Sequence, residues 1–346
     1  MQTSHNFTLD LGRCFFAFCV VFVHLGPADA SSDAVGRAFN MLSVPFFITL
    51  ALYFFIHRLR TFTHKGKHVR SSLKGLRFDR ICVPYAAWTL IYISMRFIKH
   101  GLQDQPFIPD WLHLLFFGGA GVHLYFLPFL MLCQTWVLGF FLIFQPCLKW
   151  RAAGLIFLIS AAGFGLLGMS RAYLMFESAL HDSLLYAGLA AVVHWRMGRG
   201  QVRWPESLCY YLTVIVLAAG PAFEILPPWM EGGQKALAGF GVTMLLLSLP
   251  SIRRLPASVV AVVTSTYGIY LSHHALIETV EVAASRLGLS LVPYSLASRT
   301  FIALLTCLVC ALTVIFIRKN KPLRYLLLGE NGELRDKPAV LANGGP

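Results

Sequence analysis

The sequence predicts an all-α, polytopic integral membrane protein with about ten transmembrane helices in one bundle and both termini in the cytoplasm. Of the 346 residues, 57% are hydrophobic and only 13% are charged, and the mean hydropathy is +0.65. Soluble domains have about a quarter charged residues, so this chain has too little polar surface to cover a water-soluble fold. Low charge and the lack of heptads also exclude a disordered chain and a coiled coil.

The apolar residues gather in ten stretches, and a spanning helix needs about 20 such residues. The stretches are 9–25, 38–57, 81–97, 122–144, 152–169, 183–195, 208–222, 236–250, 257–277 and 298–317. A shorter apolar piece, 111–117, is expected to lie at the membrane interface or to re-enter the membrane. The first stretch contains Asp10, Arg13 and His24, which favours a retained helix over a cleaved signal peptide. We therefore expect a transmembrane domain over 1–320 and a short cytoplasmic tail over 321–346.

The net charge of +13 follows the topology and does not indicate nucleic-acid binding. Lysine and arginine are concentrated in the segments that are cytoplasmic if the N-terminus is cytoplasmic, as the positive-inside rule requires. These segments are 58–80, 145–151, 196–207, 251–256 and 318–346, and they hold 21 of the 29 basic residues. The expected location is therefore the plasma (inner) membrane, with the lipid bilayer as a partner and no nucleic acid.

The eight cysteines lie in or beside the apolar stretches and are expected to be free small hydrophobes. Cys307 and Cys310 have the spacing of a metal-binding pair, but no second pair and no histidine lies nearby in the sequence. We therefore expect no metal.

Ionisable residues inside the spans are costly and indicate function. Arg13 and His24 are eleven residues apart, which places them on one helix face about 16 Å apart along the axis. Asp10 is three residues before Arg13 and can pair with it. A structural Arg–Asp pair and a core histidine bonded to a carbonyl remain the alternative to a catalytic role.

Further candidates lie near the ends of other spans. Tyr270 and His273 share one face of the ninth stretch, whereas His274, Glu278 and Glu281 fall toward its outer end and are expected to be solvated. His123 and Tyr125 open the fourth stretch, where an aromatic belt is the alternative. Arg77 and Arg80, at the mouth of the third stretch, are suited to clamp an anion. Simple topology-setting charge is the alternative for these two arginines.

These motifs, taken together, resemble those of the membrane-bound acyltransferase-3 family of integral-membrane sugar O-acyltransferases. The resemblance rests on Arg13 and His24, on Arg77-x-x-Arg80 before Pro84, on the run His123–Leu127, and on the block Tyr267–His273. It extends over about residues 7–318. The segment Phe46–Ala51 departs from the family by lacking a Ser-Gly pair, and Tyr125 stands where the family has a tryptophan. These departures concern helix packing and acceptor specificity more than the chemistry.

The resemblance implies transfer of an acyl group, usually acetyl, from cytoplasmic acyl-CoA to a sugar hydroxyl of a cell-surface or exported glycan. Acyl-CoA is then a donor substrate, and no permanently bound cofactor is expected. His24 would be the general base and Arg13 would stabilise the base, the thioester oxygen or a CoA phosphate. Arg77 and Arg80 would bind CoA phosphates. Asp10, His123, Tyr125, Tyr270 and His273 would support the site. The acceptor remains open among exopolysaccharide, lipid-linked oligosaccharide, lipopolysaccharide and a small lipid.

A proton-coupled secondary transporter is the alternative, with Arg13, His24, His273 and Glu278 as an intramembrane relay. The sequence lacks the internal repeats and the paired broken helices typical of such transporters. A non-catalytic scaffold would leave Arg13 and His24 without a role. Consumption of acyl-CoA by the purified protein would distinguish an acyltransferase from a transporter or a scaffold.

Overall fold

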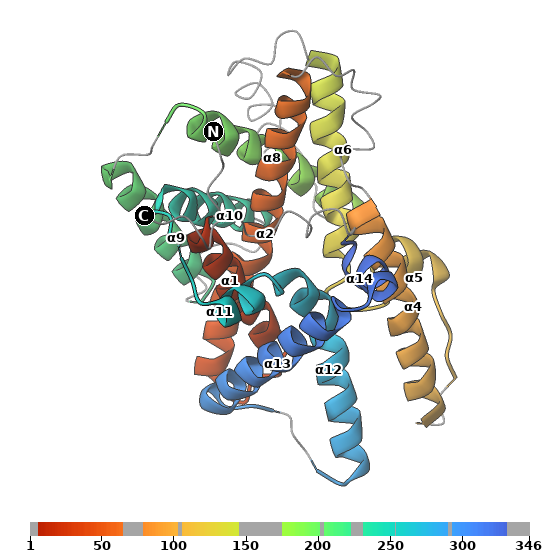
Figure 1. Cartoon of the computed structure of the whole chain (residues 1–346). Coiled ribbons are helices and arrows are strands. Elements are labelled where there is room, and N and C mark those ends of the chain that lie inside the picture. Colours follow the sequence, from red (N-terminus) through yellow and green to blue (C-terminus); the bar gives the residue numbers. More distant parts are fainter. Residues whose placement is uncertain are drawn as a thin grey trace, which may run out of the picture.

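The computed structural model describes residues 6–64, 79–102, 106–144, 175–200, 204–222, 231–252, 254–289 and 293–330, and this part is helical. Its helices are α1 (Phe7–Val23), α2 (Ala30–His64), α4 (Asp79–Leu102), α5 (Trp111–Phe116), α6 (Phe126–Phe144), α8 (Met175–Met197), α9 (Trp204–Ala222), α10 (Glu231–Ser248), α11 (Ala257–Val263), α12 (Thr266–Arg286), α13 (Leu296–Ile317) and α14 (Lys321–Leu328) (Figure 1).

The helices follow nine of the ten predicted stretches, and the stretch 152–169 lies outside the described residues. Within the described part, three helical segments are long and apolar enough to cross a membrane: Ala30–Thr61, Asp79–Leu102 and Leu296–Ile317. Phe126–Phe141 and Pro205–Gly220 are shorter apolar helices. The all-α membrane class is therefore supported, while the number ten and the orientation of the termini stay predictions. The short piece at 111–117 forms the six-residue helix α5.

One face of α13 is apolar and exposed. Its exposed side chains are Phe301, Leu304, Leu308, Leu312 and Phe316, whereas Ala303, Cys310 and Val314 on the other face are buried. Soluble proteins rarely expose a continuous apolar stripe of this length. Hydrocarbon contact explains this stripe, because a lipid-facing helix gains nothing from polar side chains.

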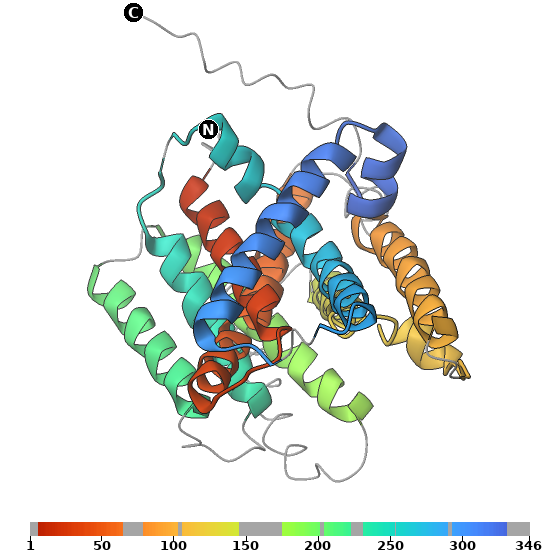
Figure 2. The same ribbon diagram turned by 90° about the horizontal axis from the view of Figure 1, so that it is seen from below.

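Helix α1 lies inside the bundle, in contact with α2, α10, α11, α12 and α13 (Figure 2). Its N-terminus is capped by Asn6, whose side chain accepts a hydrogen bond from the Leu9 N–H. Cys19, Val21 and Phe22 are at most 1% exposed. Because α1 is surrounded by other helices, its ionisable residues face protein groups and cavities.

Helices α2 and α10 pack closely at one point. Pro45 lies inside the continuous helix α2, where it has no N–H to donate within the helix. Gly239 of α10 lies against this position, and an added Cβ would be 2.4 Å from the Pro45 carbonyl oxygen. The close approach therefore requires glycine, as is common where helices associate in membranes.

The ninth predicted stretch is not one continuous helix, which corrects the expectation for 257–277. The chain breaks at Thr264 and Ser265, between α11 and α12. Their hydroxyls donate to the carbonyls of Val260 and Ala261 at 2.8 and 2.7 Å, bonds that offer the backbone an alternative to the helix. Arg318 then donates to the free Thr264 carbonyl at 2.8 Å.

Several basic segments meet at one end of the bundle, which we call the basic end and define by Thr8, Arg60, Arg80, Pro250 and Arg318. The Thr8 hydroxyl donates to the Pro250 carbonyl at 2.8 Å, and Arg60 contacts His194 of α8.

Helix α14 packs against α4 at this end. The Trp88 indole donates to the Leu327 carbonyl at 3.0 Å. Gly329 ends α14 in the left-handed conformation, with φ +62°, directly against the backbone of Arg80. The first part of the expected tail 321–346 therefore helps to hold the start of α4, and residues 331–346 lie outside the described part.

Candidate active site

Four histidines meet beyond the C-terminal end of α1. The His24 ring centroid lies 5.1 Å from that of His273, 5.4 Å from that of His274 and 6.0 Å from that of His123. The rings of His123 and His273 are 4.8 Å apart. We call these four residues the histidine cluster. Three of them were expected to support one site, and the structure brings those three together.

The backbone positions each histidine separately. His24 is the first residue after α1 and its N–H still bonds to the Val21 carbonyl at 3.2 Å. His123 lies in the turn before α6. His273 lies on α12 with Nδ1 3.1 Å from the Ile269 carbonyl. A carbonyl only accepts, so Nδ1 carries a proton and Nε2 of neutral His273 is left as an acceptor.

Burial divides the histidine cluster into two pairs. His123 and His273 are 2% and 0% exposed, whereas His24 and His274 are half-buried. Both ring nitrogens of His123 and Nε2 of His273 have no hydrogen-bond partner among the described residues. His24 and His274 are therefore the members that an incoming substrate can reach, with the other two behind them.

Two tyrosines frame the cluster. The Tyr92 hydroxyl donates to the Leu271 carbonyl and accepts from the Ala275 N–H, both at 3.0 Å, so α4 is fixed to α12 beside the histidines. The Tyr270 hydroxyl donates to the carbonyl of His123. Tyr270 is thus found where the sequence predicted support. Tyr92 was not predicted, because a lone tyrosine in an apolar stretch gives no signal of its tertiary contacts.

His274 is less solvated than the sequence predicted, and Tyr125 lies outside the described ring contacts of the histidine cluster. His274 was expected to be solvated with Glu278 and Glu281, but its ring joins the cluster, and Glu278 pairs with Lys99 at 2.9 Å. Burial of α12 against α1 and α4 extends further around the helix than the sequence pattern indicated. The Tyr125 side chain is 48% exposed and forms no ring contact with the cluster in the described part.

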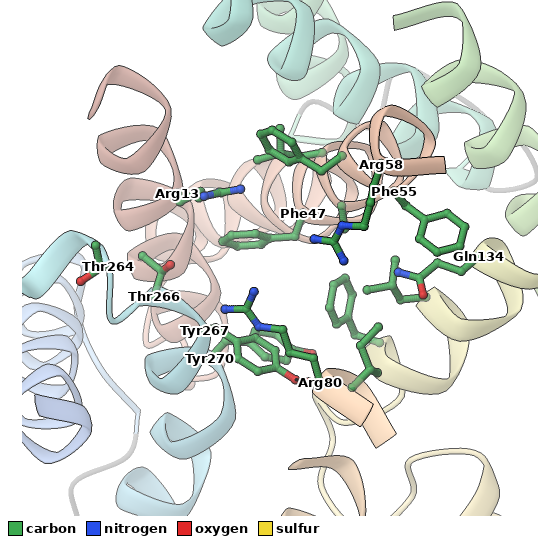
Figure 3. A pocket seen from close by; sticks show the side chains of 16 residues that line it. Arg13, Phe47, Phe55, Arg58, Arg80, Gln134, Thr264, Thr266, Tyr267 and Tyr270 are labelled. Carbon is green, nitrogen blue, oxygen red and sulfur yellow. Dashed lines mark hydrogen bonds between the residues drawn. The ribbon is translucent and has the colours of Figure 1, made fainter. Parts of the chain in front are cut away.

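A cavity of about 370 Å³ lies toward the basic end, and three arginines enter it from three helices. Arg13 comes from α1, Arg58 from α2 and Arg80 from α4, and their guanidinium groups converge (Figure 3). Among the described residues, none of those that line the cavity is Asp or Glu. Asp10 pairs with Arg13 at 3.1 Å, as predicted. The cavity is therefore suited to a ligand with several negative charges.

Gln134 of α6 and the tyrosines of α12 complete the cavity (Figure 3). Gln134 is 6% exposed and its Oε1 has no partner in the described structure. Neither Arg58 nor Gln134 was predicted, since each becomes a cavity residue only through tertiary packing. Arg77, the predicted partner of Arg80, lies outside the described residues.

Tyr270 connects the cavity to the histidine cluster. Its ring lines the cavity, and its centroid is 5.4 Å from the His123 ring and 6.1 Å from the His273 ring. Arg13 lies in the N-terminal half of α1 and His24 directly follows its C-terminus, so the two are about 16 Å apart along the helix axis. The structure thus has a cavity lined by three arginines and a cluster of four histidines, and both include residues of α1 or its C-cap and of α12.

Comparison with known proteins decides the class. A profile of the acyltransferase-3 family, described as an acyltransferase domain, matches residues 6–318. The chain belongs to the acyltransferase-3 family. Curated proteins and solved structures gave no match. Family membership supports a membrane acyltransferase in general.

No metal is assigned to this acyltransferase site. Among the described residues, no group of three or more His, Cys, Asp or Glu side chains is arranged to hold a metal ion. The seven cysteines of the described part are free.

Proposed function

We propose that this acyltransferase moves an acyl group, usually acetyl, from acyl-CoA in the basic cavity to a sugar hydroxyl at the histidine cluster. The observation that carries the proposal is the placement of Tyr270, which borders both the three-arginine cavity and the histidines. Family membership supports acyl transfer in general.

The donor is assigned to the cavity by charge. CoA carries several phosphates, and guanidinium groups bind phosphate oxygens through paired hydrogen bonds. Arg13, Arg58 and Arg80 supply these groups, and we assign the same role to Arg77, which precedes Arg80 by three residues in the sequence. Of the three roles considered for Arg13, binding a CoA phosphate fits its place, since it lies in the cavity and about 16 Å along α1 from His24.

Gln134 extends the donor site toward the acyl arm. The pantetheine arm of CoA carries amide N–H groups, and Gln134 Oε1 is a buried acceptor without a protein partner. An unpaired buried acceptor costs about 1–3 kcal/mol, and a donor amide would remove that cost on binding.

His24 is assigned as the general base because it is the half-buried histidine at the end of α1. Neutral His24 removes the proton as the acceptor hydroxyl oxygen attacks the thioester carbonyl carbon. The new C–O bond forms, the C–S bond breaks, and the proton passes from His24 to the departing CoA thiolate. Histidine suits both transfers because its pKa is normally near neutrality. The transfer is direct, without an acyl-enzyme.

The basic end is assigned to the cytoplasm, where acyl-CoA is made available, in the plasma (inner) membrane. The positive-inside rule supports this orientation. The acceptor then reaches the histidine cluster from the opposite end, as a unit of exopolysaccharide, lipid-linked oligosaccharide or lipopolysaccharide. A proton-coupled transporter would use the same histidines as a relay, but family membership favours the enzyme.

Replacement of His24 tests the proposal. His24→Ala should reduce acetyl transfer by about 10²–10⁴-fold, the usual contribution of a general base. CoA thiol release by the purified protein and mass spectrometry of surface glycans are the two measurements. The matched control is His57→Ala, which removes an exposed histidine of α2 outside the cluster. A folded His24→Ala protein with a near wild-type rate would reject His24 as the base and direct attention to His273.

A further inference from the structure

The C-terminal end of α1, which His24 directly follows, is held by a buried arginine from α13. Arg299 Nε donates to the Phe22 carbonyl at 2.9 Å and Nη2 donates to the Val23 carbonyl at 3.4 Å. Its guanidinium carbon lies 4.2 Å from the centre of the Phe22 ring. The last carbonyls of a helix have no hydrogen-bond partner within the helix, and they carry partial negative charge. A guanidinium at this place donates hydrogen bonds to them and also balances their charge.

The same guanidinium holds the next helix. Arg299 Nη1 donates to the Ser32 carbonyl at 2.6 Å and to the Ser32 hydroxyl at 3.1 Å. Arg299 is only 2% exposed, and a buried charge is costly unless it is fully hydrogen-bonded. One side chain thus fixes the end of α1 and the start of α2, on either side of His24.

A backbone bridge makes the same connection independently. The Ala28 N–H donates to the Tyr294 carbonyl and the Tyr294 N–H donates to the Gly26 carbonyl, both at 2.8 Å. The Asp29 carboxylate caps α2 by accepting from the Ser32 N–H at 2.7 Å, and the hydrogen bonds from Ser31 and Ser32 hold the Asp29 pKa below its ordinary value. The turn after His24 is therefore attached to the segment that leads into α13.

We propose that Arg299 is a positioning residue that sets the location of His24 in the histidine cluster by binding the last carbonyls of α1. The inference rests on the proposed role of His24 as the base. Among the described hydrogen bonds, Arg299 makes none to any member of the histidine cluster, so its effect on catalysis passes through the backbone next to His24.

The first test is Arg299→Gln, assayed for thiol release from acetyl-CoA by the purified protein. Misplacement of a reacting group by about 1 Å can cost about 10²-fold in rate. We expect kcat to fall by about 10–100-fold while the donor KM stays unchanged, because the three arginines of the cavity do not bond to Arg299 and Arg13 lies about 16 Å along α1 from His24. Arg299→Lys keeps one cationic donor and should restore part of kcat. A fall in the amount of folded protein with kcat per folded molecule unchanged would show a purely structural role.

A milder variant avoids loss of folding. An added Cβ at Gly36 would lie 2.9 Å from Arg299 Nη2, so Gly36→Ala should displace the guanidinium without removing it. The matched control is Gly139→Ala, where an added Cβ meets nothing within 4 Å. We expect Gly36→Ala to lower kcat by several-fold and Gly139→Ala to leave it unchanged. Equal rates for Gly36→Ala and wild type would overturn the proposal.

A double-variant cycle separates this inference from the function on which it rests. If Arg299 acts only through His24, adding Arg299→Gln to His24→Ala should cause no further loss, and the two effects should be strongly non-additive. If Arg299→Gln does not fold, Gly36→Ala takes its place in the cycle. Additive effects would reject the positioning role while keeping His24 as the base. Full activity of His24→Ala alone would instead reject the base.

Discussion

At the scale of single residues, buried and half-buried polar side chains divide into those that have protein partners and those that have none in the described part. Arg299 is hydrogen-bonded to carbonyls, and Arg318 is paired with Glu330 at 2.7 Å. Gln134 Oε1 and His273 Nε2 have no partner in the described part. Such atoms cost free energy in a folded protein, and a substrate that supplied the missing hydrogen bond would remove that cost.

The arginine cavity leads to a prediction about the donor. Arg80→Gln and Arg58→Gln should each raise the donor KM by about 10-fold or more, because a hydrogen bond to a charged group contributes about 1.5–3 kcal/mol. The measurement is the acetyl-CoA dependence of thiol release, repeated at rising salt, which should weaken donor binding in the wild type. Arg37→Gln is the control, since Arg37 pairs with Asp33 near the start of α2. An unchanged donor KM in both variants would remove the phosphate site.

Replacement of Gln134 is predicted to weaken donor binding without lowering the stability of the protein. Gln134→Leu should raise the donor KM, because the acceptor for a donor amide is lost. The same change should leave thermal stability equal or higher, because it removes a buried acceptor without a partner. Melting curves without donor and kinetics with donor are the two measurements. Loss of stability together with an unchanged KM would show that Gln134 belongs only to the helix packing.

The sequence predicted the residues that its motifs contain and missed those defined by packing. Arg13, His24, His123 and His273 were identified because an ionisable group in an apolar stretch needs a reason. Arg58 belongs to the basic segment 58–80, whose charge the positive-inside rule already explained. Its place in the cavity depends on how α2 packs relative to α1 and α4. Local sequence patterns do not predict this packing.

At the scale of helices, α1 determines the arrangement of the site. It carries Arg13 at the cavity and ends at His24 in the histidine cluster. Apolar stretches predicted the helices well, because each must satisfy its own backbone in a membrane. The break between α11 and α12 was not predicted, since Thr264 and Ser265 are compatible with a helix until Arg318 binds the freed carbonyl.

The contact of α2 with α10 gives a prediction at this scale. Gly239→Ala should destabilise the protein by about 1–3 kcal/mol, the usual cost of overpacking, because the new Cβ would lie 2.4 Å from the Pro45 carbonyl oxygen. Thermal unfolding in detergent is the measurement. Gly101→Ala, where an added Cβ meets nothing within 4 Å, is the control and should be neutral or slightly stabilising. Equal melting temperatures for Gly239→Ala and wild type would show that this contact tolerates separation.

At the scale of the whole molecule, the distribution of basic residues in the sequence can be compared with the contacts between segments at the basic end of the bundle. The basic segments beginning at 58, 251 and 318 were grouped from lysine and arginine content alone. The structure brings the same regions together, with Arg80 against Gly329 and Thr8 against Pro250. His24, Pro27 and Tyr294 lie at the other end. The contact of Arg80 with Gly329 thus supports the grouping of the first and last of these segments, and the side of the membrane stays a prediction from charge.

The orientation can be measured with single cysteines at the two ends. Cys209 is exposed, so the background is Cys209→Ser. Leu287, 77% exposed after α12, and Lys319, exposed after α13, are each replaced by cysteine and treated with a membrane-impermeant thiol reagent. We expect Leu287→Cys to react in intact cells and Lys319→Cys to react only after lysis, because the basic end is cytoplasmic under the positive-inside rule. The background protein alone shows the labelling of the remaining cysteines.

A reporter enzyme that is active only outside the cytoplasm, fused after Pro346, should remain silent for the same reason. The reverse labelling pattern, or an active reporter, would invert the molecule and place the arginine cavity away from cytoplasmic acyl-CoA. Labelling of both cysteines in intact cells would mean that no membrane separates the two ends. In either case the donor could not reach Arg13, Arg58 and Arg80 from the cytoplasm while the acceptor approaches His24 from the other side, so the proposed direction of transfer would fail with the topology.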